Sequence, residues 1–207
     1  MDRPEFYRFH QGEKTLPFAA HEYISRLSKL RADMAETGVD ACVFTSMHNV
    51  AYFSGFLYCA FGRPYALVVT PTDAVTISAG IDAAQPWRRS HGDNITYTDW
   101  QRNNYWRAIL SVTGIGQVIG YEADHLSMSQ SGLLGAFLSP KALINVAQMT
   151  MRQRMHKSAA EIDLIRNCAQ VADVGGYAVK EAVKVGTREI DVAMAGRDAM
   201  ELEIAKR

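Results

Sequence analysis

A short loop places two side chains that can bind a small zwitterion on either side of a glycine. In the run 59–65, Phe61 precedes Gly62 and Arg63 precedes Pro64. Gly62 can adopt a positive φ, while Pro64 fixes its own φ and restricts Arg63, so the loop has little conformational freedom to lose. The Arg63 guanidinium can donate two parallel hydrogen bonds to a carboxylate, and the face of Phe61 suits a delocalised cation. The pattern favours a ligand that carries both groups. A strand-end arginine and a core phenylalanine are the structural alternative.

Alternating helices and strands are predicted around this loop. Apolar residues recur at spacings of three and four in 20–36, which predicts an amphipathic helix ended by Gly38. Pro71-Thr72-Asp73 predicts a hairpin turn between two β-rich runs. Further strands are expected at 41–45, 65–70, 74–78, 95–97, 118–121 and 142–145, and further helices at 49–54, 83–90, 103–112 and 127–137. This alternation predicts an α/β fold in which helices cover a mixed sheet.

A domain boundary is predicted where Ser158 and Glu161 form a capping box. In such a box the serine hydroxyl accepts from a backbone amide and the glutamate side chain reaches back to the cap. A long helix is expected to begin there and to be weakened at Gly175-Gly176, and Thr187 is expected to cap a last helix. The sequence therefore predicts one domain over 1–157 and the start of a second over 158–207.

Composition and charge exclude several classes of partner. The chain has 207 residues, with 48% hydrophobic residues and 22 basic against 22 acidic side chains. A balanced charge gives no long-range field for nucleic acid or an anionic membrane, so neither partner is expected. No run is long and apolar enough for a membrane span, and the amino terminus lacks the apolar core of a signal peptide. Three widely spaced cysteines without metal-ligand spacing favour a reducing compartment, so a cytoplasmic protein is expected.

Several longer runs resemble the amino-terminal domain of the creatinase family, the pita-bread family that includes aminopeptidase P and prolidase. The similarity extends from about Glu22 to the last residue. The runs that carry it lie at 44–52, 56–69, 85–89, 94–102 and 151–161. The first of these begins with Phe44-Thr45-Ser46-Met47-His48-Asn49, and the second contains the Phe61-Gly62-Arg63-Pro64 loop. The resemblance implies an amino-terminal domain with a mixed sheet covered by helices, followed by the first helices of a truncated pita-bread domain.

The resemblance also implies an activity and a different role for each of the two domains. It implies a homodimeric hydrolase that converts creatine and water to sarcosine and urea without a metal or an organic cofactor. In such an enzyme the loop residues, here Phe61 and Arg63, bind the substrate from the partner subunit, and the arginine holds the substrate carboxylate. The catalytic histidine would lie in the second domain, beyond the part in 158–207, and none of the six histidines of this chain is equated with it. They are His10, His21, His48, His91, His125 and His156. The chain alone is therefore expected to contain no catalytic residue and to be inactive.

A second function class stays open at this point. Metal-dependent relatives that act beside proline and non-catalytic relatives that bind protein partners share the family's fold, and fold alone does not separate them. The alternative is therefore a non-catalytic binding or dimerisation domain of an aminopeptidase P-like or prolidase-like protein.

Other polar and aromatic clusters are expected to be structural. Glu122, Asp124 and His125 could suggest a metal, but side chains on adjacent residues of a strand end point in different directions, which favours a solvated turn. His48 is expected to lie in a helix start capped by Ser46 or an asparagine. Tryptophans and arginines could instead form a surface for a protein partner. They are Trp87, Trp100 and Trp106, with Arg88, Arg89 and Arg102.

Overall fold

The computed structural model describes residues 3–58, 62–82 and 85–207. The chain divides into two compact units, Met1–Met155 and His156–Arg207. Each unit is described by itself below.

The first unit is built on a mixed sheet of seven described strands in the order β1-β5-β4-β3-β2-β6-β7. The strands are β1 (Phe6–Arg8), β2 (Ala41–Phe44), β3 (Ala66–Val69), β4 (Ala74–Ala79), β5 (Asp93–Tyr97), β6 (Val118–Tyr121) and β7 (Ala142–Asn145). β2 pairs in parallel with β6, and β6 with β7, whereas β3 runs antiparallel to β2 and β4. The predicted α/β fold with a mixed sheet is confirmed.

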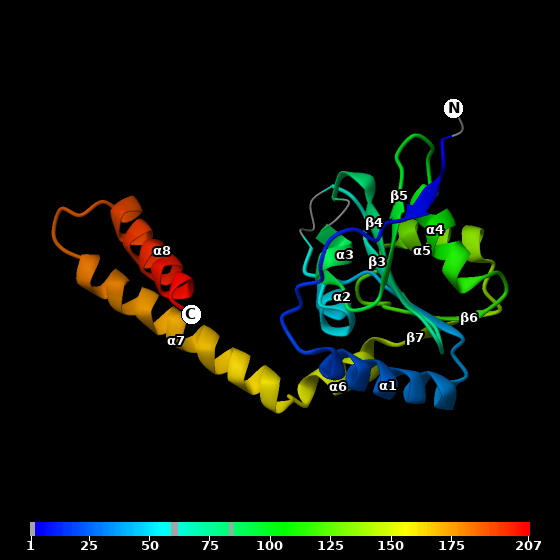
Figure 1. Cartoon of the computed structure of the whole chain (residues 1–207), viewed down its shortest axis with the longest axis horizontal. Helices are drawn as coiled ribbons and strands as arrows, with labels where there is room; N and C mark the ends of the chain where they lie inside the picture. The colour runs from blue at the N-terminus through cyan, green and yellow to red at the C-terminus, as the bar shows by residue number, and fades with distance from the viewer. Residues whose placement is uncertain (1–2, 59–61, 83–84) are drawn as a thin grey trace. The chain divides into compact units, whose positions relative to one another are not determined.

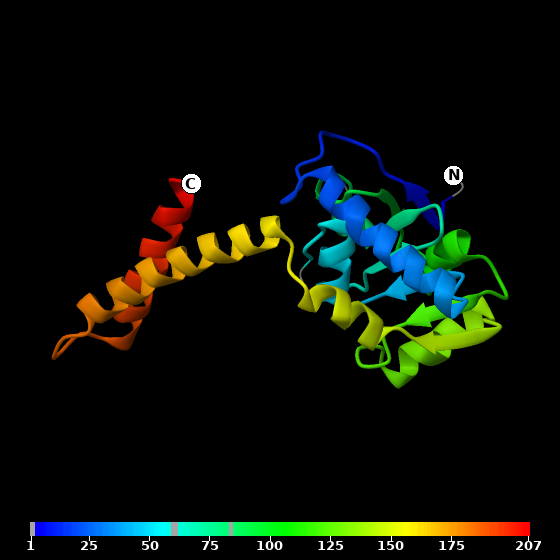
Figure 2. The same ribbon diagram turned by 90° about the horizontal axis from the view of Figure 1, so that it is seen from below.

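Successive residues of the central strands supply two hydrophobic cores, one on each face of the sheet. The described α-helices of this unit are α1 (Ala20–Thr37), α2 (Met47–Ser54), α3 (Gln85–Arg89), α4 (Asn104–Thr113), α5 (Met128–Leu138) and α6 (Ala147–Met155). On β2, Ala41 and Val43 join a core with α4 and α5, whereas Cys42 and Phe44 join a core with α1, α2 and α6. Figure 1 shows α1 and α6 together on one side of the sheet, and Figure 2 shows the same pair from below. The result is a three-layer arrangement of helices, sheet and helices.

One strand and two helices among the described elements of the first unit are not predicted from the sequence, and one of the helices is the single 3-10 turn η1 (Gly80–Asp82). β1 has three residues, and its antiparallel pairing with β5 makes it a strand. In α6, only Met149 and Thr150 are buried, and they are adjacent in the sequence, so no apolar stripe at helical spacing marks the helix. The helix predicted at 83–90 covers Gln85–Arg89 among the described residues. By contrast, α1 lies almost where it is predicted, and Gly38 ends it with the left-handed φ of 68°.

The second unit is a hairpin of two helices, α7 (Ala159–Ala182) and α8 (Glu189–Ala205). The predicted capping box at the start of α7 is confirmed, with both of its hydrogen bonds present. α7 continues through the glycine pair, and α8 packs against Gly175 so closely that a Cβ there would lie 2.6 Å from Cγ of Met200. The expected cap of α8 is wrong by one residue, since Arg188 precedes the helix. No helix of the described residues is long and apolar enough to cross a membrane.

Candidate functional site

The described part of the predicted ligand loop is anchored on its carboxyl side. Gly62 has a φ of 84°, the left-handed conformation that its lack of a side chain permits. The carbonyl oxygen of Pro64 accepts a hydrogen bond of 3.0 Å from the Tyr97 hydroxyl. Tyr65 is buried, and its carbonyl oxygen accepts a hydrogen bond of 3.2 Å from the Tyr105 hydroxyl. The backbone beside Arg63 is therefore fixed by two buried tyrosines. Phe61 lies outside the described residues.

The Arg63 side chain is half-exposed and weakly paired. Its Nη2 lies 3.3 Å from Oδ2 of Asp99, and 51% of the arginine side chain and 41% of the aspartate side chain are exposed. An ion pair at this exposure contributes little to stability, because water and salt screen it and two long side chains must be held. Arg63 therefore does not belong to the core, and its guanidinium can exchange the aspartate for another carboxylate at small cost.

A cavity of about 260 Å³ lies beside Arg63 at the carboxyl ends of two parallel strands. We call it the Arg63 cavity. Thr45, which follows β2, and His125, which follows β6, both line it, and β2 and β6 are neighbours in the sheet. Tyr58 forms part of its wall and stacks on Tyr65 with ring centres 4.7 Å apart. Clefts at the carboxyl ends of strands are the usual ligand sites of α/β sheets.

Behind this wall lies a buried carboxylate that sequence reasoning placed in a solvated turn. Glu122 is 3% exposed, so for this residue the expectation is wrong. Its oxygens accept from the backbone N–H groups of Thr45 at 2.6 Å and Ser46 at 2.8 Å, from the Ser46 hydroxyl, and from Nδ2 of Asn49 at 2.7 Å. The physical reason is that β6 lies beside β2, which brings Glu122 to the start of α2, where amide groups have no partner within the helix. The sequence signal, an acidic residue directly after an apolar strand, points to this role only once β6 is known to pair with β2.

Thr45 connects this buried carboxylate to the side chains that face the Arg63 cavity. Its N–H donates to Glu122, its carbonyl oxygen accepts from the Tyr58 hydroxyl, and its Oγ1 lies 2.9 Å from Nδ1 of His125. Burial, and then the nearby Glu122 carboxylate, raise the pKa of Tyr58 to about 12, so the hydroxyl is protonated and donates near neutral pH. His125 is exposed, and Thr45 holds its ring by one nitrogen. As expected, Ser46 caps α2 by accepting from the N–H of Asn49.

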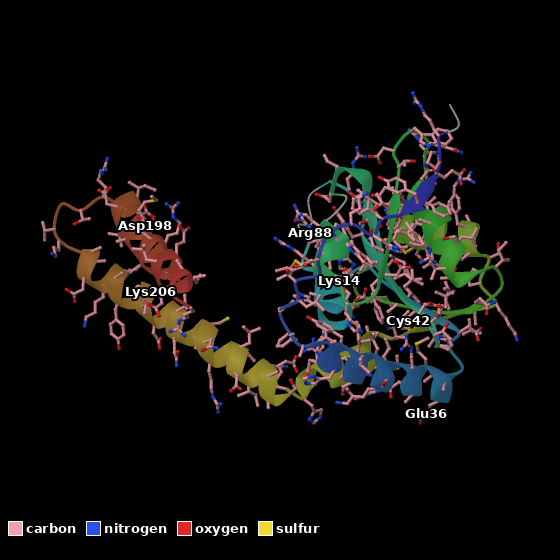
Figure 3. All side chains as sticks on the ribbon, viewed as in Figure 1. Lys14, Glu36, Cys42, Arg88, Asp198 and Lys206 are labelled. Atoms are coloured by element: carbon pink, nitrogen blue, oxygen red, sulfur yellow. The ribbon has the colours of Figure 1, made fainter. Side chains whose placement is uncertain are left out.

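The tryptophans do not form one surface with the arginines. Trp106 is 2% exposed and belongs to the core, as the structural expectation has it, and this contradicts only the alternative of a partner surface. Trp87 donates from its ring nitrogen to the carbonyl oxygen of Gly12, and Nζ of Lys14, labelled in Figure 3, lies 3.8 Å from the centre of that ring. The aromatic groups therefore serve separate structural contacts. In the part of the chain that the structure describes, no three His, Cys, Asp or Glu side chains gather as a metal site would require.

Comparisons with known proteins point to one family. The family model of the creatinase/prolidase N-terminal domain matches residues 26–156. The chain is 46% identical over 200 residues to a creatinase from Bacillus sp. (strain B-0618), a match that covers 94% of the chain and 49% of that protein. It is 24% identical over 175 residues to the uncharacterized peptidase YqhT of Bacillus subtilis (strain 168), covering 81% of the chain and 46% of that protein. The chain thus spans about half the length of these curated relatives.

Solved structures show the same fold. The prolidase from Pyrococcus horikoshii OT3 matches with a TM-score of 0.71 at 20% identity, over 86% of this chain and 48% of that one. The X-Pro aminopeptidase from Thermotoga maritima MSB8 matches with a TM-score of 0.72 at 16% identity, over 86% of this chain and 49% of that one. At these identities the likeness shows the fold alone.

Proposed function

The chain belongs to the creatinase/prolidase N-terminal domain family, and we propose that it is the amino-terminal part of a creatinase-type hydrolase. The reaction is the hydrolysis of creatine to sarcosine and urea. The observation that carries the proposal is Arg63, whose backbone is anchored while its guanidinium is half-exposed beside a cavity. The 46% identity to a creatinase supports this activity over that of the prolidase and the X-Pro aminopeptidase, whose solved structures match at 20% and 16% identity.

In this proposal the chain recognises the substrate and a second domain performs the chemistry. Arg63 offers its planar fork to the substrate carboxylate, which is the geometry that a carboxylate accepts with two hydrogen bonds. Phe61, on the same loop, offers an aromatic face to the cationic guanidino group. Water adds to the amidino carbon in the catalytic domain, and the C–N bond to sarcosine breaks as the sarcosine nitrogen takes up a proton. The chain contributes no acid or base to that step, so alone it releases no urea from creatine.

Assembly, organisation and compartment follow from the same reasoning. Residues 1–157 form the amino-terminal domain, and 158–207 begin the catalytic domain. The loop acts on the partner subunit's active site, so the enzyme is a homodimer with two shared sites. It works in the cytoplasm without a metal or an organic cofactor. Light scattering of the chain joined to a complete catalytic domain tests the assembly, because a monomer at every concentration contradicts a shared site.

Replacement of Arg63 tests the function directly. In the chain joined to a complete catalytic domain, Arg63→Ala removes a charge-assisted contact of about 1.5 to 3 kcal/mol, so kcat/KM for creatine should fall about 10- to 150-fold. Arg63→Lys keeps the positive charge but loses the two parallel N–H donors of the guanidinium, so its kcat/KM for creatine should lie between those of Arg63→Ala and the unchanged enzyme. Arg152→Ala is the matched control, since Arg152 in α6 is also exposed and does not line the Arg63 cavity. Unchanged kinetics in both Arg63 variants would remove Arg63 from the site, and turnover of a proline dipeptide instead of creatine would favour the prolidase-type alternative.

A further inference from the structure

Three backbone carbonyl groups converge on the ammonium group of Lys14. Nζ of Lys14 donates to the carbonyl oxygens of Ser90 at 2.8 Å and His91 at 3.2 Å, and to that of Gly92. The same nitrogen lies 3.8 Å from the centre of the Trp87 ring, within the range of a cation–π contact. An ammonium group has three N–H donors and no acceptor, so these contacts use all of its hydrogen-bonding capacity. We call the three carbonyl oxygens and the indole face the ammonium site.

The three carbonyl groups lie between two elements of the first unit. α3 ends at Arg89 and β5 begins at Asp93, so residues 90–92 belong to neither. Carbonyl groups in such a segment are not committed to a helix or to a strand ladder, and those shielded from water need a donor from elsewhere. Lys14 supplies the donors from 76 to 78 positions earlier in the chain. The contact is therefore set by the fold and has no local sequence signal.

Contacts that do not involve Lys14 hold the ammonium site in place. The N–H of His91 donates to the carbonyl oxygen of Ser54, a buried residue at the end of α2, at 2.7 Å. Gly92 lies against β4 so closely that a Cβ there would lie 2.0 Å from the carbonyl oxygen of Ala74. The oxygens should therefore keep their positions when the ammonium group is removed. A site formed in advance loses little free energy to ordering when a ligand binds.

The ammonium site recognises its cation through neutral oxygens. The Asp93 carboxylate, next to Gly92 in the chain, is paired with Arg8 and His10. Burial lowers the pKa of Lys14 from its ordinary value of 10.5, because the ammonium group has lost part of its water. The carbonyl oxygens replace that water one N–H at a time. The site therefore suits a primary ammonium group and not a quaternary one, which has no N–H to donate.

Lys14 joins the ammonium site to a segment that has no helix or strand. This segment, residues 9–15, follows β1 directly, and we call it the strap. The N–H of Thr15 also donates to the carbonyl oxygen of Arg88, at 2.7 Å. β1 is the edge strand of the sheet and pairs with β5 alone. A strap that is held in place therefore also helps to keep β1 on β5, whose edge would otherwise be open to pairing with another chain.

We propose that residues 87–92 form a binding site for a primary ammonium group, and that the chain fills it with its own Lys14 to fasten the strap to the first unit. The proposal does not depend on the proposed function. A tethered group has an effective concentration on the order of millimolar or more, so a free amine does not displace it from the unchanged chain. When the Lys14 side chain is shortened, a free alkylammonium ion takes its place.

Chemical rescue of Lys14→Ala tests the proposal, because n-propylammonium reproduces the part of the side chain that this substitution removes. In the 207-residue variant, hydrogen exchange of the Thr15 amide should be at least about tenfold faster than in the unchanged chain. Titration with n-propylammonium chloride should shift the indole N–H signal of Trp87 in nuclear magnetic resonance spectra, with a dissociation constant on the order of 10 millimolar. At ten times that concentration, exchange of the Thr15 amide should slow about tenfold. The indole signals of Trp100 and Trp106 should stay unmoved.

Three controls separate the site from general effects. Lys14→Met fills the same space without an ammonium group, so its strap should also loosen but n-propylammonium should find no room. Tetramethylammonium chloride supplies the same charge and ionic strength without an N–H donor, and it should leave Lys14→Ala unchanged. Lys29→Ala removes an exposed lysine of α1 and should behave like the unchanged chain.

Two results in Lys14→Ala would overturn the proposal. One is the absence of a saturable shift of the Trp87 signal with n-propylammonium. The other is equal rescue by tetramethylammonium, since salt alone would then explain the effect. If Lys14→Ala fails to fold, the ammonium hydrogens of the unchanged chain decide the matter. Those of Lys14 should exchange with water at least about tenfold more slowly than those of Lys29, and equal exchange would show that the carbonyl oxygens do not hold them.

Discussion

Removal of the Glu122 carboxylate should strongly destabilise the first unit. In Glu122→Ala, two backbone N–H groups, one hydroxyl and one amide group lose their shared acceptor in a region that is shielded from water. Unsatisfied buried donors cost about 1 to 3 kcal/mol each, but the groups relax together, and loss of one partner from a buried charged network costs about 3 to 5 kcal/mol. For a domain of this size the melting temperature should fall by about 6 to 20 °C. Glu122→Gln keeps one acceptor oxygen, so its melting temperature should lie between those of Glu122→Ala and the unchanged chain.

Tryptophan fluorescence during urea unfolding measures this effect without interference from the second unit. All three tryptophans, at positions 87, 100 and 106, lie in the first unit. The midpoint of unfolding should shift at constant slope, because the surface exposed on unfolding stays the same. Asp124→Ala is the matched control: it removes an exposed carboxylate two residues away and should change the free energy of unfolding by less than about 0.5 kcal/mol. A Glu122→Ala shift below about 1 kcal/mol would refute the reasoning, because the four donors would then have found water or other partners.

Two further predictions concern pH and helix packing. Burial, and then the charge of Lys14, lower the pKa of His91 from its ordinary value of 6.5, so as the pH falls below 6.5 the unfolded chain takes up a proton that the folded chain resists. The free energy of unfolding should therefore decrease from pH 7 to about pH 5, and His91→Gln should remove part of this slope in urea titrations. In Gly196→Ala, the new Cβ would lie 2.6 Å from Cγ2 of Val179, so thermal unfolding of the helical hairpin by circular dichroism should begin at a lower temperature. Gly176→Ala is its control, since nothing lies within 4 Å of that position, and higher stability in Gly196→Ala would contradict the close approach of the helices.

The elements that could be predicted from the sequence are those whose signals are local. The apolar spacing of α1 and the glycine after it lie within one stretch of chain, as do Ser158 and Glu161 of the capping box. The turn between β3 and β4 likewise depends on neighbouring residues. Local propensity and packing agree in these segments, which is why short patterns suffice.

The features that could not be predicted depend on partners far along the chain. Glu122 contacts residues more than 70 positions away, and no property of the turn 122–125 reveals that β6 will lie beside β2. The burial of Trp106 likewise depends on residues distant in the sequence, because Trp106 lies in the core between α4 and the sheet. At the site, the sequence singled out Arg63, whose loop has an unusual local composition, but it gave His125 no role beyond a turn. A candidate residue could be recognised in the sequence only where its own neighbours carried the signal.

The contacts that position the backbone beside Arg63 are different from those that determine the affinity of its guanidinium for a carboxylate. The Tyr97 and Tyr105 hydroxyls hold the backbone at Pro64 and Tyr65 when the domain folds, so a ligand does not bear the entropy cost of ordering these two residues on binding. The guanidinium itself starts from a half-exposed pair with Asp99, and a carboxylate ligand replaces one carboxylate with another. The net gain from this contact is therefore the difference between two similar ion pairs, which is small. In the proposed function this chain therefore supplies orientation and selectivity for the carboxylate, and tight binding of a substrate requires contacts from a second domain.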